Sequence, residues 1–227
     1  MDYQFDFSFL STHWLALLQG LASTLRMSVF TILLGFIVGT ALAVVRTQGA
    51  PWMRRVVTVY VDVIRNTPLV IQAFWLFFGL ATLQMKVPAL TAAVIALTIN
   101  VSAYTTEIMR AGIESIPRGQ IEAASCLGMS RWKMLRLVIL PQAAERMYPA
   151  LISQFVLMML ATSIMSQISV EELTSAGYII QSETFRGFEI YLVVAVLYLV
   201  LSSLLRLSMA GLASAVFARR RRLKTPL

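Results

Sequence analysis

The chain of 227 residues is 58% hydrophobic and 13% charged, whereas a soluble domain is usually about 45–50% apolar and about 25% charged. So little charge would leave a soluble protein without enough polar surface, which excludes a soluble globular domain and indicates a protein that resides in a lipid bilayer. At about 20 residues per span, the length allows about five transmembrane helices with their loops.

Five hydrophobic runs follow one another along the chain and predict an all-α integral membrane protein. We expect a single transmembrane domain over residues 1–227 with its membrane core over 23–214. The expected spans cover residues 23–45, 61–83, 88–109, 148–168 and 189–213.

Two of these spans carry local signals. Gly35 and Gly39 form a GxxxG pattern in the first span, which predicts close packing against another helix. Pro68 interrupts the second span, because proline breaks regular helical hydrogen bonding. Asp62 and Arg65 precede it on one helix face. We therefore expect an amphipathic approach to the membrane followed by a shorter span.

Lysine and arginine are distributed unevenly among the loops that five spans would create. One side of the membrane would collect 15 of the 19 basic residues. Because cytoplasmic loops carry the excess of lysine and arginine, this bias predicts an external N-terminus and a cytoplasmic C-terminus. The net charge of +8 and the basic tail over 215–227 fit membrane topology and lipid headgroups, so we expect no nucleic-acid partner.

A polar segment over 110–147 separates the third and fourth spans, on the predicted cytoplasmic side. A short helix is expected over 118–127, with Gly128 as a left-handed stop. Ser130 can cap a second helix that runs to Leu140, and Pro141 is expected to break it. Such a hairpin is either an amphipathic element that lies on lipid headgroups or a docking site for a cytoplasmic partner.

The same segment resembles a known family signature. The order EAA, three residues, glycine, nine residues and VILP is similar to the cytoplasmic EAA motif of permease subunits in ATP-binding-cassette importers. The stretches IRNTPLVIQ (64–72) and ILPQAAERMYPALISQF (139–155) resemble the polar amino acid branch, with its histidine, glutamine and arginine permeases. Asn66 replaces the glycine that is usual there, and Val138 replaces isoleucine. The motif positions are Glu122, Ala123, Ala124, Gly128, Val138, Leu140 and Pro141.

This resemblance implies a type I importer permease in the bacterial inner membrane that moves a polar amino acid or close analogue into the cytoplasm. It implies a second permease subunit, identical or related, a dimer of ATPase subunits at the cytoplasmic loop, and an external solute-binding protein. We expect Arg118 and Glu122 to contact the rim of the ATPase, and Ala123, Ala124 and Gly128 to allow close packing.

The energy source is expected on another chain. The sequence has no Gly-Lys dipeptide, so it cannot contain the nucleotide-binding loop that ends in GK[ST]. We therefore expect no enzyme activity and no cofactor on this chain, with ATP and magnesium on the partner ATPase. His13 and Cys126 are single, so neither a metal cluster nor an internal disulfide is expected.

Polar side chains inside the expected spans are candidates for the substrate path, because such residues are costly in a bilayer and are often functional. Alternatively, they hydrogen-bond to neighbouring helices. Glu107 is expected to reach the cytoplasmic interface and to pair with Arg110. The candidates are Gln72, Asn100, Tyr104, Gln154, Thr162, Ser163 and Gln167.

The fourth span departs from the family pattern. Many relatives carry Lys-Asp before the Thr-Ser pair, and this chain has Leu160 and Ala161 there. Gln154, two turns earlier, lies on the same helix face as Ala161 and is the leading candidate for a polar contact with substrate. Because this span offers no fixed charge, we expect a neutral or acidic substrate, or a partner permease that supplies a carboxylate.

Two other classes of membrane protein remain as alternatives. A secondary transporter also places polar groups at mid-membrane, but it usually shows internal repeats, and none is visible in the sequence. A membrane scaffold or sensor that transports nothing would fit five spans but would leave the polar insertion unexplained.

Overall fold

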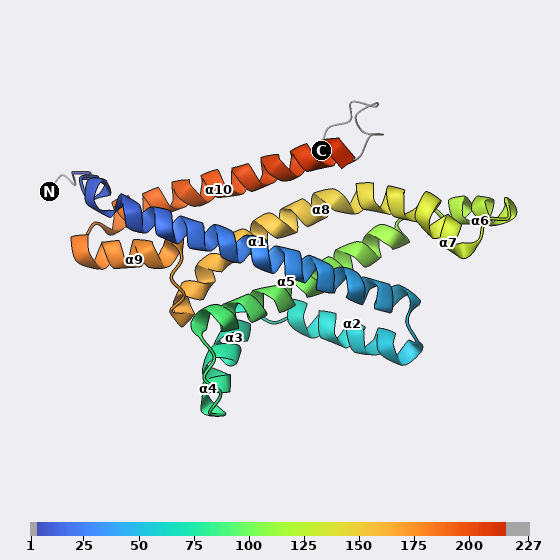
Figure 1. The fold of residues 1–227 in the computed structure, drawn as a ribbon, viewed down its shortest axis with the longest axis horizontal. Coiled ribbons are helices and arrows are strands. Elements are labelled where there is room, and N and C mark those ends of the chain that lie inside the picture. Colours follow the sequence, from blue (N-terminus) through green and yellow to red (C-terminus); the bar gives the residue numbers. More distant parts are fainter. Residues whose placement is uncertain (1–3, 217–227) are drawn as a thin grey trace. The chain divides into compact units, whose positions relative to one another are not determined.

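The computed structural model describes residues 4–216, and these form helices without any strand (Figure 1). From position 217 on, the predicted basic tail over 215–227 lies outside the described residues. Of the short elements, η1 and η2 are π-helical turns and η3 is a 3-10 helix. In chain order the elements are α1 (Leu10–Gln48), α2 (Pro51–Arg65), α3 (Leu69–Phe74), η1 (Trp75–Gly79), α4 (Leu80–Thr82), α5 (Ala89–Glu114), α6 (Arg118–Cys126), α7 (Arg131–Met134), η2 (Leu135–Ile139), α8 (Leu140–Ala161), η3 (Thr162–Ile168), α9 (Leu173–Thr184) and α10 (Gly187–Val216).

Four helical segments among the described residues are long and apolar enough to cross a membrane. They are Leu10–Gln48, Ala89–Glu114, Arg131–Ile168 and Gly187–Ala215. The pair formed by Pro51–Arg65 and Leu69–Thr82 is bent by 104°, and the count rises to five if this pair is one span. The expectation of an all-α membrane protein is therefore confirmed.

The interruption of the second expected span, over 61–83, at Pro68 is confirmed. α2 ends at Arg65, where the backbone N–H of Asn66 donates to the carbonyl of Asp62, and α3 begins after Pro68 in an extended conformation. The bend follows from the proline, because its ring disfavours helical geometry in the preceding residue and it has no N–H to donate.

The expected break at Pro141 is wrong. Helix continues from Arg131 to Ile168, because the π-helical turn η2 lies just before the proline and the N–H of Leu140 donates to the carbonyl of Leu135. Such a widened turn shifts the hydrogen-bond register and is a common way to accommodate a proline within a helix. The fourth membrane helix therefore begins inside the polar segment, well before the expected start at residue 148.

The first helix also exceeds its expected bounds of 23–45. α1 has 39 residues, which corresponds to a length of about 58 Å at about 1.5 Å per residue. The hydrocarbon core of a bilayer is only about 30 Å thick, so α1 must tilt or project into the aqueous phase. The hydropathy of its first turns is diluted by polar residues such as His13, which explains why the sequence pattern misses them.

The described residues divide into two compact units. One comprises residues 4–34, 67–99 and 156–205, and the other comprises residues 35–66, 100–155 and 206–216. We refer to them as the first and second unit.

In the first unit, α9 packs on parts of α1 and α10 around a buried hydrophobic cluster. Glu172 is 1% exposed and caps α9 by accepting the N–H of Ser175 at 2.8 Å, while the hydroxyl of Tyr198 donates to it at 2.6 Å. Burial raises the pKa of the Glu172 carboxyl, although its hydrogen bonds oppose this shift. The cluster consists of Phe9, Leu17, Leu173, Ile180, Ile190, Val194 and Tyr198.

In the second unit, α1 and α5 approach each other closely at Gly39. A Cβ atom built on Gly39 would lie 2.6 Å from the carbonyl oxygen of Ser102 and 2.6 Å from Cβ of Thr105. The hydroxyl of Thr106 donates to the carbonyl of Gly39 at 3.1 Å. The close packing predicted from the GxxxG pattern is therefore confirmed at Gly39.

Replacing Gly39 by alanine should separate these helices and destabilise the protein by about 1–3 kcal/mol, the usual range for overpacking a tight core. The measurement is the midpoint of thermal unfolding of the purified complex in detergent, which should fall. Gly211→Ala is the matched control, because nothing lies within 4 Å of a Cβ atom built there. Equal midpoints for the two variants would contradict the close approach of α1 and α5.

Candidate functional site

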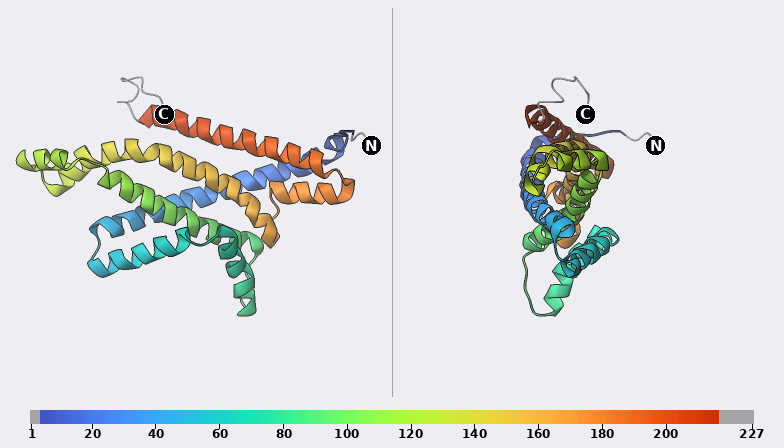
Figure 2. Two further views of the ribbon diagram at one scale, coloured as in Figure 1. Left: turned by 180° about the vertical axis from the view of Figure 1, so that it is seen from behind. Right: turned by 90° about the vertical axis from the view of Figure 1, so that its right-hand side faces the viewer.

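Helices α6 and α7 form a short hairpin in the second unit (Figure 1 and Figure 2). α6 ends in a Schellman motif, in which the N–H of Met129 donates to the carbonyl of Ala124 at 3.2 Å and the N–H of Gly128 to that of Ser125 at 3.0 Å. Gly128 has φ +70°, so the left-handed stop predicted from the sequence is confirmed. This motif satisfies the carbonyls of Ala124 and Ser125 within the turn itself.

The start of α7 is satisfied in the same way. The hydroxyl of Ser130 accepts the N–H of Lys133 at 3.4 Å, which confirms the predicted N-cap. Both ends of the turn between the helices are thus held by local hydrogen bonds, and the hairpin is a defined element rather than a loose loop.

The residues proposed for coupling do not share one environment. Arg118, Glu122, Ala123 and Gly128 are exposed, whereas Ala124 is buried with 4% exposure. Ala124 therefore packs within the second unit, and the outer surface of the hairpin is formed by the charged and small residues around it.

Two large apolar side chains are strongly exposed on the hairpin. Leu127 is 80% exposed and Trp132 is 67% exposed, and Cys126 beside them is also exposed. Exposed apolar groups among charged ones are typical of a surface that contacts another protein or a membrane. The residues expected to couple to the ATPase included neither side chain.

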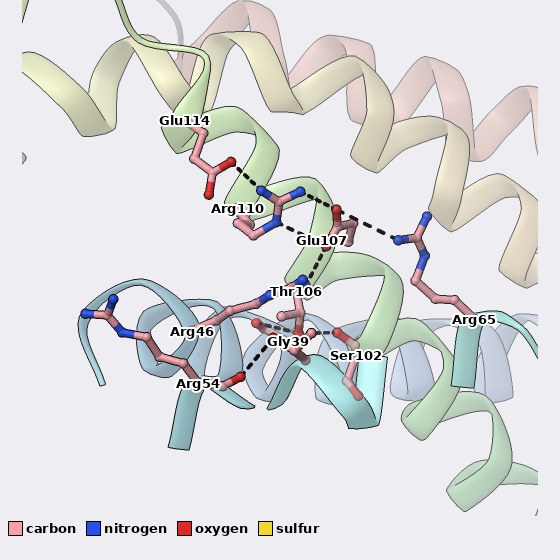
Figure 3. Close-up of polar contacts among 10 residues, drawn as sticks. Gly39, Arg46, Arg54, Arg65, Ser102, Thr106, Glu107, Arg110 and Glu114 are labelled. Carbon is pink, nitrogen blue, oxygen red and sulfur yellow. Dashed lines mark hydrogen bonds and ion pairs between the residues drawn. The ribbon is translucent and has the colours of Figure 1, made fainter. Parts of the chain in front are cut away.

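A cluster of charged residues surrounds Glu107 in the second unit (Figure 3). Arg46 of α1 donates to Oε2 of Glu107 at 2.5 Å, and Arg110 of α5 donates to Oε1 at 2.5 Å and to Oε2 at 3.2 Å. Arg110 also pairs with Glu114. The predicted pair between Glu107 and Arg110 is confirmed, whereas sequence spacing could not reveal Arg46, which is 61 positions away from Glu107.

Arg65, the last residue of α2, completes the cluster. Its Nη1 atom lies 3.9 Å from Oε1 of Glu107, and its guanidinium carbon lies 5.2 Å from the ring centroid of Tyr104, within the range of a cation–π interaction. The sequence placed Arg65 on one helix face with Asp62, but it could not predict that Arg65 contacts Tyr104 and Glu107 of α5.

The candidates for the substrate path fall into two groups. Three of them lie in the second unit. Asn100 is buried and Tyr104 is half-buried, and both lie on one face of α5 because they are four residues apart. Gln154, on α8, is 9% exposed. The other four candidates lie in the first unit: Gln72, Thr162, Ser163 and Gln167. The side-chain amide of Gln72 donates to the hydroxyl and carbonyl oxygens of Thr67, just before α3.

Two of the η3 candidates are satisfied by their own helix. The hydroxyl of Thr162 donates to the carbonyl of Met159 at 2.6 Å, and that of Ser163 donates to the carbonyl of Leu160 at 2.7 Å. Gln167 is exposed. The hydroxyls of Thr162 and Ser163 thus serve local backbone bonding in this structure.

The first unit contains a half-open cavity of about 670 Å³ that no sequence pattern suggested. Its lining is mainly apolar but includes Arg26 and Glu171, so it presents one charge of each sign. It contains none of the substrate-path candidates. Residues from α1, α5 and the turn after η3 meet there, which only folding could bring together. The lining residues are Ser23, Arg26, Met27, Phe30, Leu90, Val94, Ser169, Val170 and Glu171.

Comparison with known proteins identifies relatives over nearly the whole chain. A glutamine transport system permease protein, GlnP of Escherichia coli (strain K12), is 38% identical over 204 residues, which cover 89% of this chain and 93% of that protein. An octopine transport system permease protein, OccM of Rhizobium radiobacter, is 33% identical over 226 residues, covering 96% of this chain and 92% of that protein.

Solved structures agree with this relationship. A crystal structure of an amino acid ABC transporter with histidines matches with a TM-score of 0.86 and 36% identity, covering 96% of this chain and all of that chain. An inward-facing structure of the MetNI methionine ABC transporter shares the fold with a TM-score of 0.76, at 21% identity and with 93% of this chain covered.

A family model for the inner membrane components of binding-protein-dependent transport systems matches residues 31–218. This range includes the α6–α7 hairpin and the residues around Glu107. The chain therefore belongs to that family and is a non-enzymatic permease subunit of the ATP-binding-cassette type.

Proposed function

We propose that this permease translocates a polar amino acid or a close analogue into the cytoplasm, driven by ATP hydrolysis on a separate chain. The exposed α6–α7 hairpin carries this proposal, because it presents the EAA segment on a locally stabilised element in a chain of this family. The substrate class is supported by the names of the relatives, which include permeases for glutamine and octopine.

The hairpin is proposed as the docking element for a dimer of ATPase subunits, which hold ATP and magnesium. Its exposed Arg118, Glu122 and Ala123 would form the contact, and Leu127 and Trp132 would add apolar area that is now exposed. Gly128 allows the chain to turn back sharply, and the buried Ala124 anchors α6. A rigid hairpin of this kind can transmit movement of the ATPase to the helices that flank it.

The other partners follow from the same proposal. A second permease subunit, identical or related, would complete the path, and an external solute-binding protein would deliver the substrate, as the family description implies. The path would include Gln72, Asn100, Tyr104, Gln154 and residues of η3. Because Leu160 and Ala161 provide no charge in the fourth membrane helix, a complex with two copies of this permease should favour neutral or acidic substrates.

Substrate-stimulated ATP hydrolysis of the purified complex, measured across a panel of amino acids with the external binding protein present, tests this function. We expect stimulation by neutral or acidic members, and by glutamine in particular. Arginine and lysine should stimulate poorly when this permease is the only permease type, since an unpaired cation in the membrane costs about 3 kcal/mol or more. Uptake into proteoliposomes is the confirming measurement, and efficient uptake of arginine or lysine would contradict the charge argument.

Changing Gly128 to valine should uncouple the permease. The left-handed conformation at φ +70° is unfavourable for a β-branched residue, so the Schellman turn would rearrange and the hairpin would lose its shape. We expect a several-fold loss of substrate-stimulated ATP hydrolysis, or loss of ATPase attachment, while the permease still inserts.

Charge reversal at Glu122, Glu122→Arg, should weaken ATPase attachment without altering the turn. Gly119→Ala is a control, because Gly119 lies in the same helix and nothing lies within 4 Å of a Cβ atom built there. Normal coupling in both Gly128→Val and Glu122→Arg would show that the hairpin is only a membrane-surface element.

The proposed orientation places the N-terminus outside, which puts the hairpin in the cytoplasm and α9 outside. The native Cys126 is exposed on α6 and should react with an impermeant maleimide only in inside-out vesicles. In a Cys126→Ser background, an exposed reporter on α9, Ser182→Cys, should react only in right-side-out cells or spheroplasts. Labelling of both positions from the same side would contradict a five-span topology.

A further inference from the structure

Arg65 carries a charge that its own cluster does not compensate. Three arginines, Arg46, Arg65 and Arg110, face two carboxylates, Glu107 and Glu114. Both oxygens of Glu107 accept hydrogen bonds of 2.5 Å from Arg46 and Arg110. Arg65 is 3.9 Å away, beyond hydrogen-bond distance, so the surplus positive charge falls on it.

The surroundings of Arg65 hold it in place without using its donors. The ring of Tyr104 lies on one side of the guanidinium, 5.2 Å from its central carbon. The side chain of Arg65 is 37% exposed, compared with 14% for Arg46 and 27% for Arg110. A guanidinium that is steadied by an aromatic ring and keeps its N–H groups open is well suited to bind a carboxylate with two parallel hydrogen bonds.

Arg65 also lies beside residues already proposed for the substrate path. Asn100, Tyr104 and Glu107 follow one another at positions i, i+4 and i+7 of α5, so they share one helix face. Arg65 meets this face at Tyr104 and Glu107 and precedes the bend between α2 and α3. A solute that contacts Asn100 or Tyr104 therefore comes within reach of the open guanidinium.

We propose that Arg65, steadied by Tyr104, binds the α-carboxylate of the transported amino acid. This assignment rests on the proposed function and deepens it, because it makes a free carboxylate the feature that every substrate shares. Glu107 does not repel the ligand strongly, since two other arginines neutralise it. Within the described cluster around Glu107, Arg65 is the arginine whose N–H groups stay open to a carboxylate.

Equilibrium binding to the complex of permease and ATPase in phosphatidylcholine nanodiscs, without the external binding protein, tests the assignment. The probe is tritiated L-glutamine, or the amino acid with the strongest uptake in the panel above, and the competitors are the unlabelled amino acid and its α-amide. In the wild type, the α-amide should compete at least tenfold more weakly. In Arg65→Gln, the amino acid should bind at least tenfold more weakly and the preference over the amide should disappear.

Two further variants separate ligand binding from a structural role. Arg65→Lys keeps the charge but not the bidentate geometry, so it should retain part of the preference. Arg54→Gln removes an exposed arginine of α2 that lies outside the cluster and donates to the carbonyl of Gly49 at 2.7 Å, so the preference should persist. If Arg65→Gln fails to assemble with the ATPase, Arg65→Lys decides, and an affinity and preference equal to the wild type would overturn the assignment.

The remaining outcomes distinguish the alternatives. A preference for the carboxylate that survives in Arg65→Gln, or an equal loss for the amino acid and its amide, overturns the assignment and leaves the proposed function intact. Unchanged amino acid binding, together with lost binding of phosphatidylglycerol in native mass spectrometry, would assign Arg65 to a lipid phosphate instead. If the wild type takes up no amino acid, the proposed function fails and this inference fails with it.

Discussion

The carboxylate of Glu107 imposes the strongest constraint on the second unit. An unpaired charge in a membrane helix is costly, and Glu107 is neutralised by hydrogen bonds from Arg46 of α1 and Arg110 of α5. Arg46 lies seven residues after Gly39, which is about two helical turns along the same face. The close approach of α1 and α5 at Gly39 and the ion pair at Arg46 therefore depend on each other, because both require the same face of α1 to meet α5.

The irregular parts of the membrane helices show how the chain satisfies its backbone in a bilayer. In lipid, each backbone N–H and carbonyl needs an internal partner, so a proline must be compensated locally. At Pro141 a π-helical turn absorbs the change in register and the helix continues. At Pro68 the helix stops and restarts after a bend of 104°. The difference is that Pro68 is itself extended and caps the start of α3, whereas Pro141 lies within the first turn of α8.

The α6–α7 hairpin is stabilised by its own hydrogen bonds, which leaves its outer surface available. The Schellman turn at Gly128 and the cap at Ser130 satisfy the backbone between the two helices. The hairpin can therefore expose Leu127 and Trp132 without losing its shape. The proposed transmission of ATPase movement requires a stiff element, because a loose loop would absorb the movement instead of transmitting it.

Neighbouring residues alone specify the class of fold and the local structure of the hairpin. Charge depletion and hydrophobic runs identify a helical membrane protein, and the left-handed turn at Gly128, the cap at Ser130 and the pair of Glu107 with Arg110 are local features that need only neighbouring residues. The expected helix break at Pro141 was wrong because Pro141 has the same chemistry as Pro68. Only the surrounding backbone decides whether a proline ends a helix or is accommodated within it.

The contacts between distant side chains depend on how the helices pack. Arg46 and Glu107 are 61 positions apart, Thr24 and Glu172 are 148 apart, and the cavity beside Arg26 draws on three separate segments. Helical periodicity specifies the face on which a residue lies, but it does not specify which face of another helix packs against it. That choice depends on packing over the whole unit, as at Gly39, where the absence of a side chain allows α5 to approach and brings the charged residues together.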